Sequence, residues 1–268
     1  MEALRQVDGW PAPTAAAGVV RSGEVVAVHG PRDSVFPWAS VTKLVTAMAA
    51  LVAAEEGVID LDAPAGPEGS TVRHLLAHAS GLPFNPGAPT AKPEQRRMYS
   101  NVGFELLAEH VGERAEMPFA AYLSAGVLQP LGMRAELRGS PASALHGDLD
   151  DLLLFARELQ RPTLVAPETL ADATTVQFPG LAGVLPDIGR FDPLDWGLGF
   201  ELRDAKDPHW TGTRASPRTF GHFGGTGTFL WVDPDADVAL GVLTDLEFGE
   251  WAKEAWPQLS DAVLAEER

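Results

Sequence analysis

The segment from residue 36 to residue 43 reads Phe36-Pro37-Trp38-Ala39-Ser40-Val41-Thr42-Lys43 and runs into an apolar stretch that ends before Gly57. The apolar side chains there follow the i, i+3, i+4, i+7 spacing of an α-helix, at Val41, Leu44, Val45, Met48, Leu51 and Val52. Alanines fill the opposite side, which is typical of a buried helix. We expect this helix to begin at Pro37, because proline is favoured in a first turn.

Ser40 and Lys43 are three residues apart in this helix, and no other serine precedes a lysine at that spacing. The spacing puts both side chains on one helix face, with Cβ atoms roughly 5–6 Å apart. An isolated pair of this kind is usually an ordinary surface pair. Here the helix is expected to be buried and offers Lys43 no carboxylate, so the lysine either has a partner elsewhere or a lowered pKa. A neutral lysine beside a serine is a general base for a nucleophile.

Two further motifs follow along the chain. Tyr99-Ser100-Asn101 precedes a helical run, and Gly221-His222-Phe223-Gly224-Gly225-Thr226-Gly227 lies between strand-like segments. Taken alone, Tyr99 is an ordinary amphipathic tyrosine at a helix start. The glycine-rich run is followed by a strand and not by a helix, so it does not have the context of a phosphate-binding loop. Glycines on a strand instead let a substrate approach the backbone.

The three motifs in this order resemble the penicillin-recognising serine hydrolases, the superfamily of serine β-lactamases, DD-peptidases and related esterases. Its pattern is S-x-x-K, then Y-x-N, then K-T-G or H-x-G. The class C-like branch is the most similar, and the segment Leu75-Leu76-Ala77-His78-Ala79-Ser80-Gly81-Leu82-Pro83 supports the match. The likeness runs from about Ala16 to Leu264. Three motifs in order are far more specific than one.

The resemblance implies a role for each motif residue. Ser40 is the nucleophile, Lys43 accepts or relays its proton, and Tyr99, as a phenolate or hydrogen-bonded to Lys43, moves protons to the leaving group. The implied substrate-binding and oxyanion residues are Asn101, His222, Gly224 and Gly225. The oxyanion donors are the backbone N–H groups of Ser40 and Gly225, and such a donor typically contributes about 10²–10³ in rate.

The third motif departs from the family pattern, because Phe223 stands where penicillin-cleaving enzymes usually have a hydroxyl residue. We therefore expect a serine hydrolase acting on small esters or amides through an acyl-Ser40 intermediate. The alternatives are a β-lactamase, a D-amino-acid peptidase or DD-peptidase, and an acyltransferase. A catalytically silent relative that binds a ligand is the alternative outside enzymes.

The predicted architecture is α/β, with one antiparallel five-stranded-type sheet assembled from both termini and flanked by helices. A sheet lobe is expected over residues 1–62 and 195–268, and an inserted, mainly helical lobe over 63–194. Strands are expected at Ala16–Val20, Glu24–His29, Trp196–Leu202, Thr228–Asp233 and Val238–Thr244, and a C-terminal helix around Trp256. Further helices are expected at Thr71–His78, Asn101–Val111, Phe119–Leu128, Asp148–Leu159 and Pro167–Ala173, with loops at Asn85–Gln95 and Val176–Asp195.

The amino-acid composition limits the kinds of binding partner and cofactor that we expect. The chain has 268 residues, a formal charge of −17 and no cysteine, which excludes disulfides and thiolate chemistry. No Lys/Arg cluster is present, so we expect neither a nucleic-acid nor a membrane partner. His74 and His78 have the spacing of metal ligands on one helix face, but no acidic neighbour completes a site, so we expect no metal or cofactor. No signal peptide is visible, which favours the cytoplasm, and the oligomeric state is left open.

Overall fold

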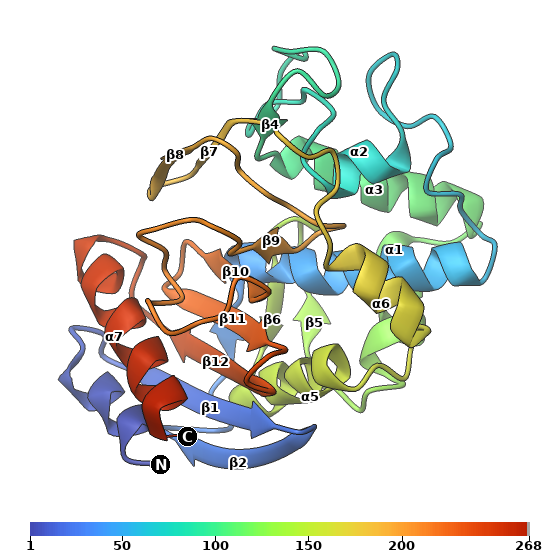
Figure 1. Ribbon diagram of the computed structural model, residues 1–268. Coiled ribbons are helices and arrows are strands. Elements are labelled where there is room, and N and C mark those ends of the chain that lie inside the picture. The colour runs from blue at the N-terminus through green and yellow to red at the C-terminus, as the bar shows by residue number, and fades with distance from the viewer. Residues whose placement is uncertain (267–268) are drawn as a thin grey trace.

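The computed structural model describes residues 1–266. Its centre is a six-stranded antiparallel sheet with the strand order β2-β1-β12-β11-β10-β9 (Figure 1). The first strand, β1 (Ala15–Arg21), lies between β2 (Glu24–His29) and the last strand, β12 (Val238–Thr244). The sheet is therefore built from both ends of the chain, and the expected fold class is confirmed. It has six strands where five were expected, because β10 was not among the predicted strands. The remaining strands are β11 (Thr228–Asp233), β10 (Phe220–Gly224) and β9 (Glu201–Leu202).

Both faces of this sheet are covered by helices. On one face β1 contributes Ala17 and Val19 to a core with α7 (Glu250–Glu266) and the 3₁₀ helix η1 (Ala3–Gly9). On the other face Ala16 and Val20 join a core with α5 (Leu149–Gln160) and α1 (Thr42–Glu55). Successive strand residues point to opposite faces, so strands covered on both faces consist of continuous apolar residues.

Two glycines allow α5 to lie close to the sheet. Gly18 of β1 and Gly241 of β12 are paired in register. A Cβ atom at Gly18 would lie 2.6 Å from a methyl of Leu153, and one at Gly241 would lie 2.8 Å from a methyl of Leu152. Real Cβ atoms are essentially never that close, so a larger residue at either position would force these leucine side chains of α5 to shift.

The expected helices between residues 71 and 173 are confirmed. They are α2 (Val72–Leu76), α3 (Asn101–Arg114), α4 (Phe119–Leu123) with the π-helical turn Ser124–Leu128, α5 and α6 (Pro167–Ala173). Two small sheets were not predicted. One joins β3 (Phe36–Pro37), β6 (Leu145–Gly147) and β5 (Glu136–Leu137), and the other joins β4 (Arg97–Met98), β7 (Gly183–Leu185) and β8 (Gly189–Phe191).

The structure corrects two predicted elements. Pro37 does not open a helix, because it pairs with His146 in β3, and the 3₁₀ turn η2 (Ala39–Val41) precedes α1. The strand expected over Trp196–Leu202 is reduced to β9. The backbone N–H of Gly197 donates to Phe200 O at 2.8 Å, so the chain turns back on itself inside the predicted strand.

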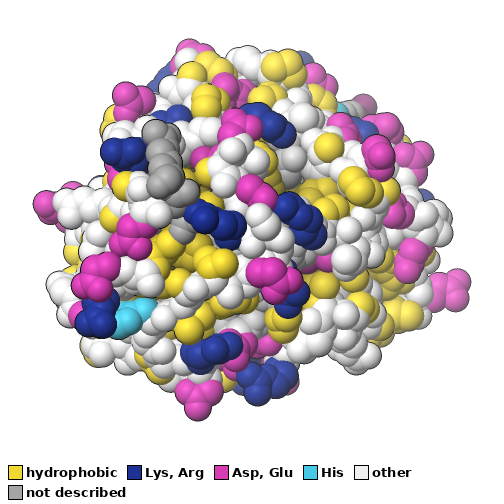
Figure 2. Space-filling view, turned by 60° about the horizontal axis from the view of Figure 1, so that its bottom comes forward, with side chains coloured by type: hydrophobic (Ala, Val, Ile, Leu, Met, Phe, Trp, Pro, Cys, Tyr) yellow, Lys and Arg dark blue, Asp and Glu magenta, His cyan; other side chains and the backbone are white. Residues whose placement is uncertain are grey.

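The expected division into two lobes, 1–62 with 195–268 and 63–194, stays a prediction. Helix α5 comes from the second range and packs against β1 and β12 of the sheet. Figure 2 shows acidic and basic side chains interspersed on the face near the C-terminal end. Within residues 1–266, no helix combines the length and the hydropathy that a bilayer crossing requires.

Candidate active site

Ser40 lies in the η2 turn, on a segment that is held from both sides. The buried Trp38 donates its backbone N–H to Leu145 O at 2.9 Å and its indole N–H to Gly147 O at 3.2 Å. Its carbonyl accepts a hydrogen bond from the Thr228 hydroxyl of β11 at 3.1 Å. Ala39 has a φ of 43°, in the left-handed region that is unfavourable for residues other than glycine. The nucleophile candidate therefore follows a strained residue in a fixed turn.

Lys43 is fully buried beside Ser40, as the three-residue spacing predicts. Its Nζ lies 3.2 Å from Ser40 Oγ, 2.6 Å from Asn101 Oδ1 and 2.8 Å from the carbonyl oxygen of Ala142. No carboxylate forms an ion pair with Lys43 within the described residues. Burial lowers the pKa of Lys43 well below its usual 10.5, and the more distant Glu105 carboxylate opposes this only in part.

The three neighbours of Nζ determine the hydrogen bonds that a neutral Lys43 can make. The oxygens of Asn101 and Ala142 are hydrogen-bond acceptors only. A neutral amine has two hydrogens and one lone pair, so these two oxygens take both hydrogens. When Lys43 is neutral and these two oxygens accept its hydrogens, its lone pair is left for the Ser40 hydroxyl, whose oxygen lies 3.2 Å away. This arrangement is that of a general base and a nucleophile.

Tyr99 is buried, and its ring covers the Lys43 amine. Nζ lies 4.7 Å from the ring centroid, so the amine meets the face of the ring and is not hydrogen-bonded to the phenol oxygen. Within residues 1–266 the Tyr99 hydroxyl has no hydrogen-bond partner of good geometry, although the Ser40 hydroxyl is near enough to lower its pKa. Burial outweighs that effect and, with the Glu201 carboxylate, raises the pKa of Tyr99 above 10. The neutral phenol is therefore the resting form, rather than the phenolate that the resemblance allowed.

Ser100 holds the backbone between Tyr99 and Asn101 in place. No role was assigned to it from the sequence. Its side chain caps α3 by accepting from Gly103 N at 2.9 Å and donates to Pro83 O at 2.7 Å. Its backbone N–H donates to His78 Nδ1 at 3.1 Å. A serine directly before a helix is a recognised cap signal, so this role was readable from the sequence. The Ala142 carbonyl gave no such signal, because it is backbone.

His222 and Phe223 of β10 point to opposite sides of the sheet. The His222 ring lies 5.4 Å from the Tyr99 ring and 5.5 Å from Trp196, measured between centroids. Phe223 packs 5.8 Å from Trp256 of α7, so its ring is in the core and not in the site. The position where the family carries a hydroxyl residue therefore supplies no polar group here.

His222 is a neutral acceptor at physiological pH. Burial lowers the pKa of His222 to about 3, and Lys43 acts in the same direction whenever it is protonated. Nδ1 lies 2.6 Å from Phe223 O, so it carries the proton, and Nε2 presents a lone pair. Nε2 is buried and has no partner within residues 1–266.

Gly224 and Gly225 have different spatial requirements. A Cβ at Gly224 would lie 2.6 Å from Trp38 O and 2.9 Å from Ala39 Cβ, so β10 lies directly against the Ser40 segment. A Cβ at Gly225 would meet nothing within 4 Å. Gly225 is exposed, and it directly follows β10, which lies against the Ser40 turn.

His74 and His78 make contacts with different partners. His74 Nδ1 accepts from Thr71 N at 3.2 Å, and its Nε2 lies 3.1 Å from Glu94. His78 Nδ1 accepts from Ser100, and its ring packs on Tyr99 at 4.7 Å. Among residues 1–266 no group of three or more His, Asp or Glu side chains is placed to hold a metal ion.

Comparison with known proteins identifies the family. The family model described as Beta-lactamase matches residues 5–264, nearly the whole chain. The chain belongs to the beta-lactamase family. The resemblance found in the three motifs is therefore confirmed, and with it the coarse assignment to a family of serine hydrolases that includes penicillin-binding-protein-like members.

Individual relatives agree with the beta-lactamase assignment. The crystal structure of a beta-lactamase from Mycobacterium bovis is 55% identical, with a TM-score of 0.97 and 99% of each chain covered. Penicillin-binding protein 4* of Bacillus subtilis (strain 168) is 27% identical over an alignment of 226 positions, which covers 68% of this chain and 49% of that protein. The chain thus spans about half the length of that relative. EstCE1, a hydrolase with promiscuous acyltransferase activity, has the same fold at 18% identity, with a TM-score of 0.78 and coverage of 98% and 96%.

Proposed function

We propose that this protein hydrolyses small esters or amides through an acyl-Ser40 intermediate. Lys43 takes the proton of the Ser40 hydroxyl while Oγ attacks the substrate carbonyl carbon. The backbone N–H groups of Ser40 and Gly225 stabilise the oxyanion. Tyr99, as a neutral phenol, donates its proton to the leaving oxygen or nitrogen as that bond breaks. The proton on Lys43 then returns to the Tyr99 oxygen through a water molecule, because the two groups are not hydrogen-bonded to each other. Water then attacks the acyl carbon and returns Ser40 to its starting form.

The observation that carries this proposal is the environment of Lys43. Its amine is fully buried, both of its hydrogens have acceptors in Asn101 and Ala142, and the Ser40 oxygen lies 3.2 Å away. A binding protein would gain nothing from a buried lysine without a carboxylate partner, because its desolvation costs stability. A catalyst requires it, because only the deprotonated amine can take the serine proton.

The same site favours esters and amides over β-lactams. A β-lactam carries a carboxylate next to its scissile bond, which a nearby cation would recognise. Here His222 is neutral and presents a lone pair, Lys43 has a strongly lowered pKa, and Phe223 supplies no hydroxyl.

Steady-state hydrolysis of p-nitrophenyl acetate and of a chromogenic cephalosporin tests the proposal. We expect turnover of the ester with a much lower kcat/KM for the cephalosporin. Ser40→Ala should reduce the ester rate to the buffer blank, and Lys43→Met should lower it by about 10²–10⁴. Ser124→Ala, a serine in the π-helical turn, is the matched control and should keep wild-type activity. Ester turnover by the Ser40→Ala protein would refute the proposal, and stoichiometric binding of these compounds without turnover would favour the silent ligand-binding relative.

A further inference from the structure

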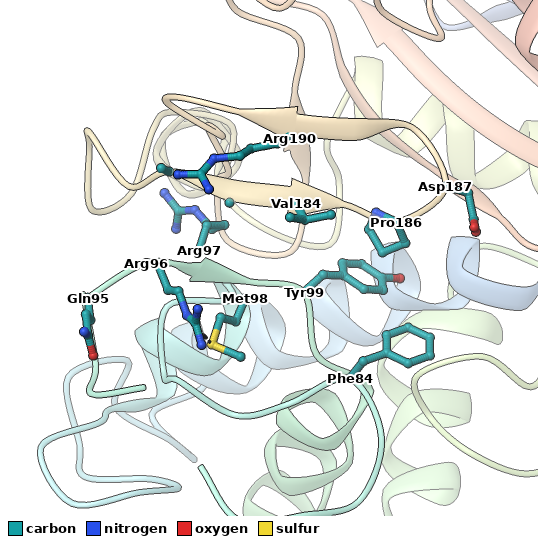
Figure 3. A pocket seen from close by; sticks show the side chains of 12 residues that line it. Phe84, Gln95, Arg96, Arg97, Met98, Tyr99, Val184, Pro186, Asp187 and Arg190 are labelled. Carbon is teal, nitrogen blue, oxygen red and sulfur yellow. Dashed lines mark hydrogen bonds between the residues drawn. The ribbon is translucent and has the colours of Figure 1, made fainter. Parts of the chain in front are cut away.

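A groove of about 800 Å³ has Tyr99 in its lining (Figure 3). It lies between the loop at Phe84, strand β4 and the β7–β8 hairpin. The Tyr99 ring lines it, while the Tyr99 hydroxyl belongs to the Ser40 cluster. Tyr99 therefore joins the groove to the site of the proposed chemistry.

Apart from its charged residues, the groove presents accessible apolar side chains. Phe84 and Val184 are 45% and 56% exposed, which is unusual for side chains of this kind. The β-sheet register places Met98 opposite Val184, and Val184 opposite Arg190. Residues opposite each other share a sheet face, so these three side chains form one row. Two strand spacings, together about 10 Å, separate Met98 from Arg190.

The far end of the groove is basic. Figure 3 shows Arg190 and Arg96 at the end opposite Tyr99 and Phe84. Arg190 makes no hydrogen bond or ion pair with any residue of the described range 1–266. Arg96 donates only to Met98 Sδ and to Thr90 O, both at 3.3 Å, and neither is a carboxylate. Two guanidinium groups without an acidic partner are notable in a chain with a formal charge of −17.

Arg97 and Asp187 complete the charges of the groove. The buried Arg97 guanidinium is committed to the fold, because it donates to the carbonyls of Leu194, Ala77 and Gln177 at 3.0, 2.6 and 2.7 Å. Asp187 lies at the hairpin tip, at the opposite end from Arg190 in Figure 3. The groove is thus negative near its hairpin tip and positive at its far end.

We propose that the substrate carries an anionic group at the end of an apolar segment, and that Arg96 and Arg190 bind this group. The apolar segment lies on Phe84, Met98 and Val184. The Asp187 carboxylate repels an anion from the hairpin tip, so a singly charged substrate is held in one direction, with its reacting carbonyl toward Tyr99. This inference rests on the proposed function only in treating the groove as the path of the substrate.

A binding experiment tests the proposal without relying on turnover. The Ser40→Ala protein, which cannot be acylated, is titrated calorimetrically with p-nitrophenyl hexanoate and with the mono-p-nitrophenyl ester of adipic acid, which ends in a carboxylate instead of a methyl group. We expect the adipate ester to bind more tightly, and Arg190→Gln or Arg96→Gln to weaken its binding about 5- to 10-fold. The hexanoate ester should change less than about twofold. The preference should also shrink between low and high salt, because the groove is open to solvent.

Arg114→Gln is the matched control, since Arg114 is exposed at the end of α3 and does not line the groove. Hydrolysis of the same esters by proteins with an intact Ser40 is measured in parallel. A second substrate pair is included in that assay, the acetate ester of 4-hydroxyphenylpropionate and the acetate ester of the corresponding amide. In this pair the carboxylate, where present, belongs to the leaving group and not to the acyl group. Equal effects of the arginine variants on charged and neutral esters, or no effect on either charged ester, would overturn the inference. Charge-selective binding without any hydrolysis would leave the inference standing and refute the proposed function instead.

Discussion

Asn101 Oδ1 lies 2.6 Å from Lys43 Nζ, and this contact joins two motifs that are 58 residues apart in the chain. Because the amide oxygen has no net charge, it orients the lysine and stabilises a charge on it less than a carboxylate would. A carboxylate at the same position would favour the protonated amine much more strongly, since an opposite charge would then lie this close.

The Asn101→Asp variant separates positioning from charge. We expect it to raise the pKa of Lys43 and to lower kcat/KM for p-nitrophenyl acetate at neutral pH by about tenfold or more. Activity should recover partly as the pH rises, with the acid limb of the profile moved about 1–3 pH units to higher pH. Asn101→Ala should lower activity without moving that limb to higher pH. An unmoved profile in Asn101→Asp would show that Lys43 does not titrate as the base.

The wild-type pH profile should follow Lys43 on its acid side and Tyr99 on its alkaline side. Because burial lowers the pKa of Lys43 well below 10.5, kcat/KM should rise with pH and reach its plateau far below that value. Because the pKa of Tyr99 is raised above 10, the plateau should continue past pH 9. Rates are corrected with the Ser40→Ala protein at each pH. An acid limb centred near 10.5 would mean that Lys43 is an ordinary solvated lysine.

Acid stability should depend on His222. Its pKa is about 3 in the folded protein against an ordinary value of 6.5, so between these values the unfolded chain binds a proton that the folded protein does not. The free energy of unfolding therefore increases with pH across this window, and the contribution of His222 to it is lost as the pH falls. A single group contributes a slope of at most about 1.4 kcal/mol per pH unit.

The test of this prediction is urea denaturation between pH 4 and pH 7. His222→Gln should have a smaller slope over that range, because glutamine does not titrate. His78, whose pKa is also lowered by burial, gives a residual slope of the same sign that is common to both proteins. Identical slopes in the two proteins would contradict the burial of a neutral imidazole at position 222.

The two glycines of the third motif should respond differently to substitution. Gly224→Ala places a methyl group 2.6 Å from Trp38 O, so the Ser40 segment or β10 must shift. We expect a loss of about 1–3 kcal/mol in the free energy of unfolding, with a large loss of activity. Gly225→Ala has open space and should keep the stability and at least a tenth of the activity. Thermal unfolding and ester hydrolysis measure both, and equal tolerance at the two positions would contradict this packing.

The catalytic part of the site could be predicted from the sequence because the information is local. Ser40 and Lys43 share a helix turn, and a buried apolar helix without carboxylates already indicates a lowered lysine pKa. The pairing of β1 with β12 was also accessible, because both are short apolar strands at opposite ends of the chain. Tyr99, Asn101 and His222 came from the family resemblance, since no local pattern links them to Ser40.

The rest depends on contacts that residue types do not encode. The Ala142 carbonyl holds Lys43 through the backbone, so the residue type at this buried position does not reveal the contact. The β7–β8 hairpin consists of two strands of three residues each, which are too short for a periodic pattern. A loop was therefore predicted there from the sequence. Pro37 met the rule for a first-turn proline, but its pairing with His146 in β3 overrode that local preference.

The central claim is that Ser40 is the nucleophile and that a buried, deprotonated Lys43 activates it. Intact-mass spectrometry with peptide mapping, after exposure to a fluorophosphonate, tests it most directly. The account predicts one adduct per chain, located on Ser40, that forms at least about 100-fold more slowly in Lys43→Met and not at all in Ser40→Ala. An adduct that forms on Ser40→Ala at the wild-type rate, or a wild-type protein that stays unlabelled, would contradict it.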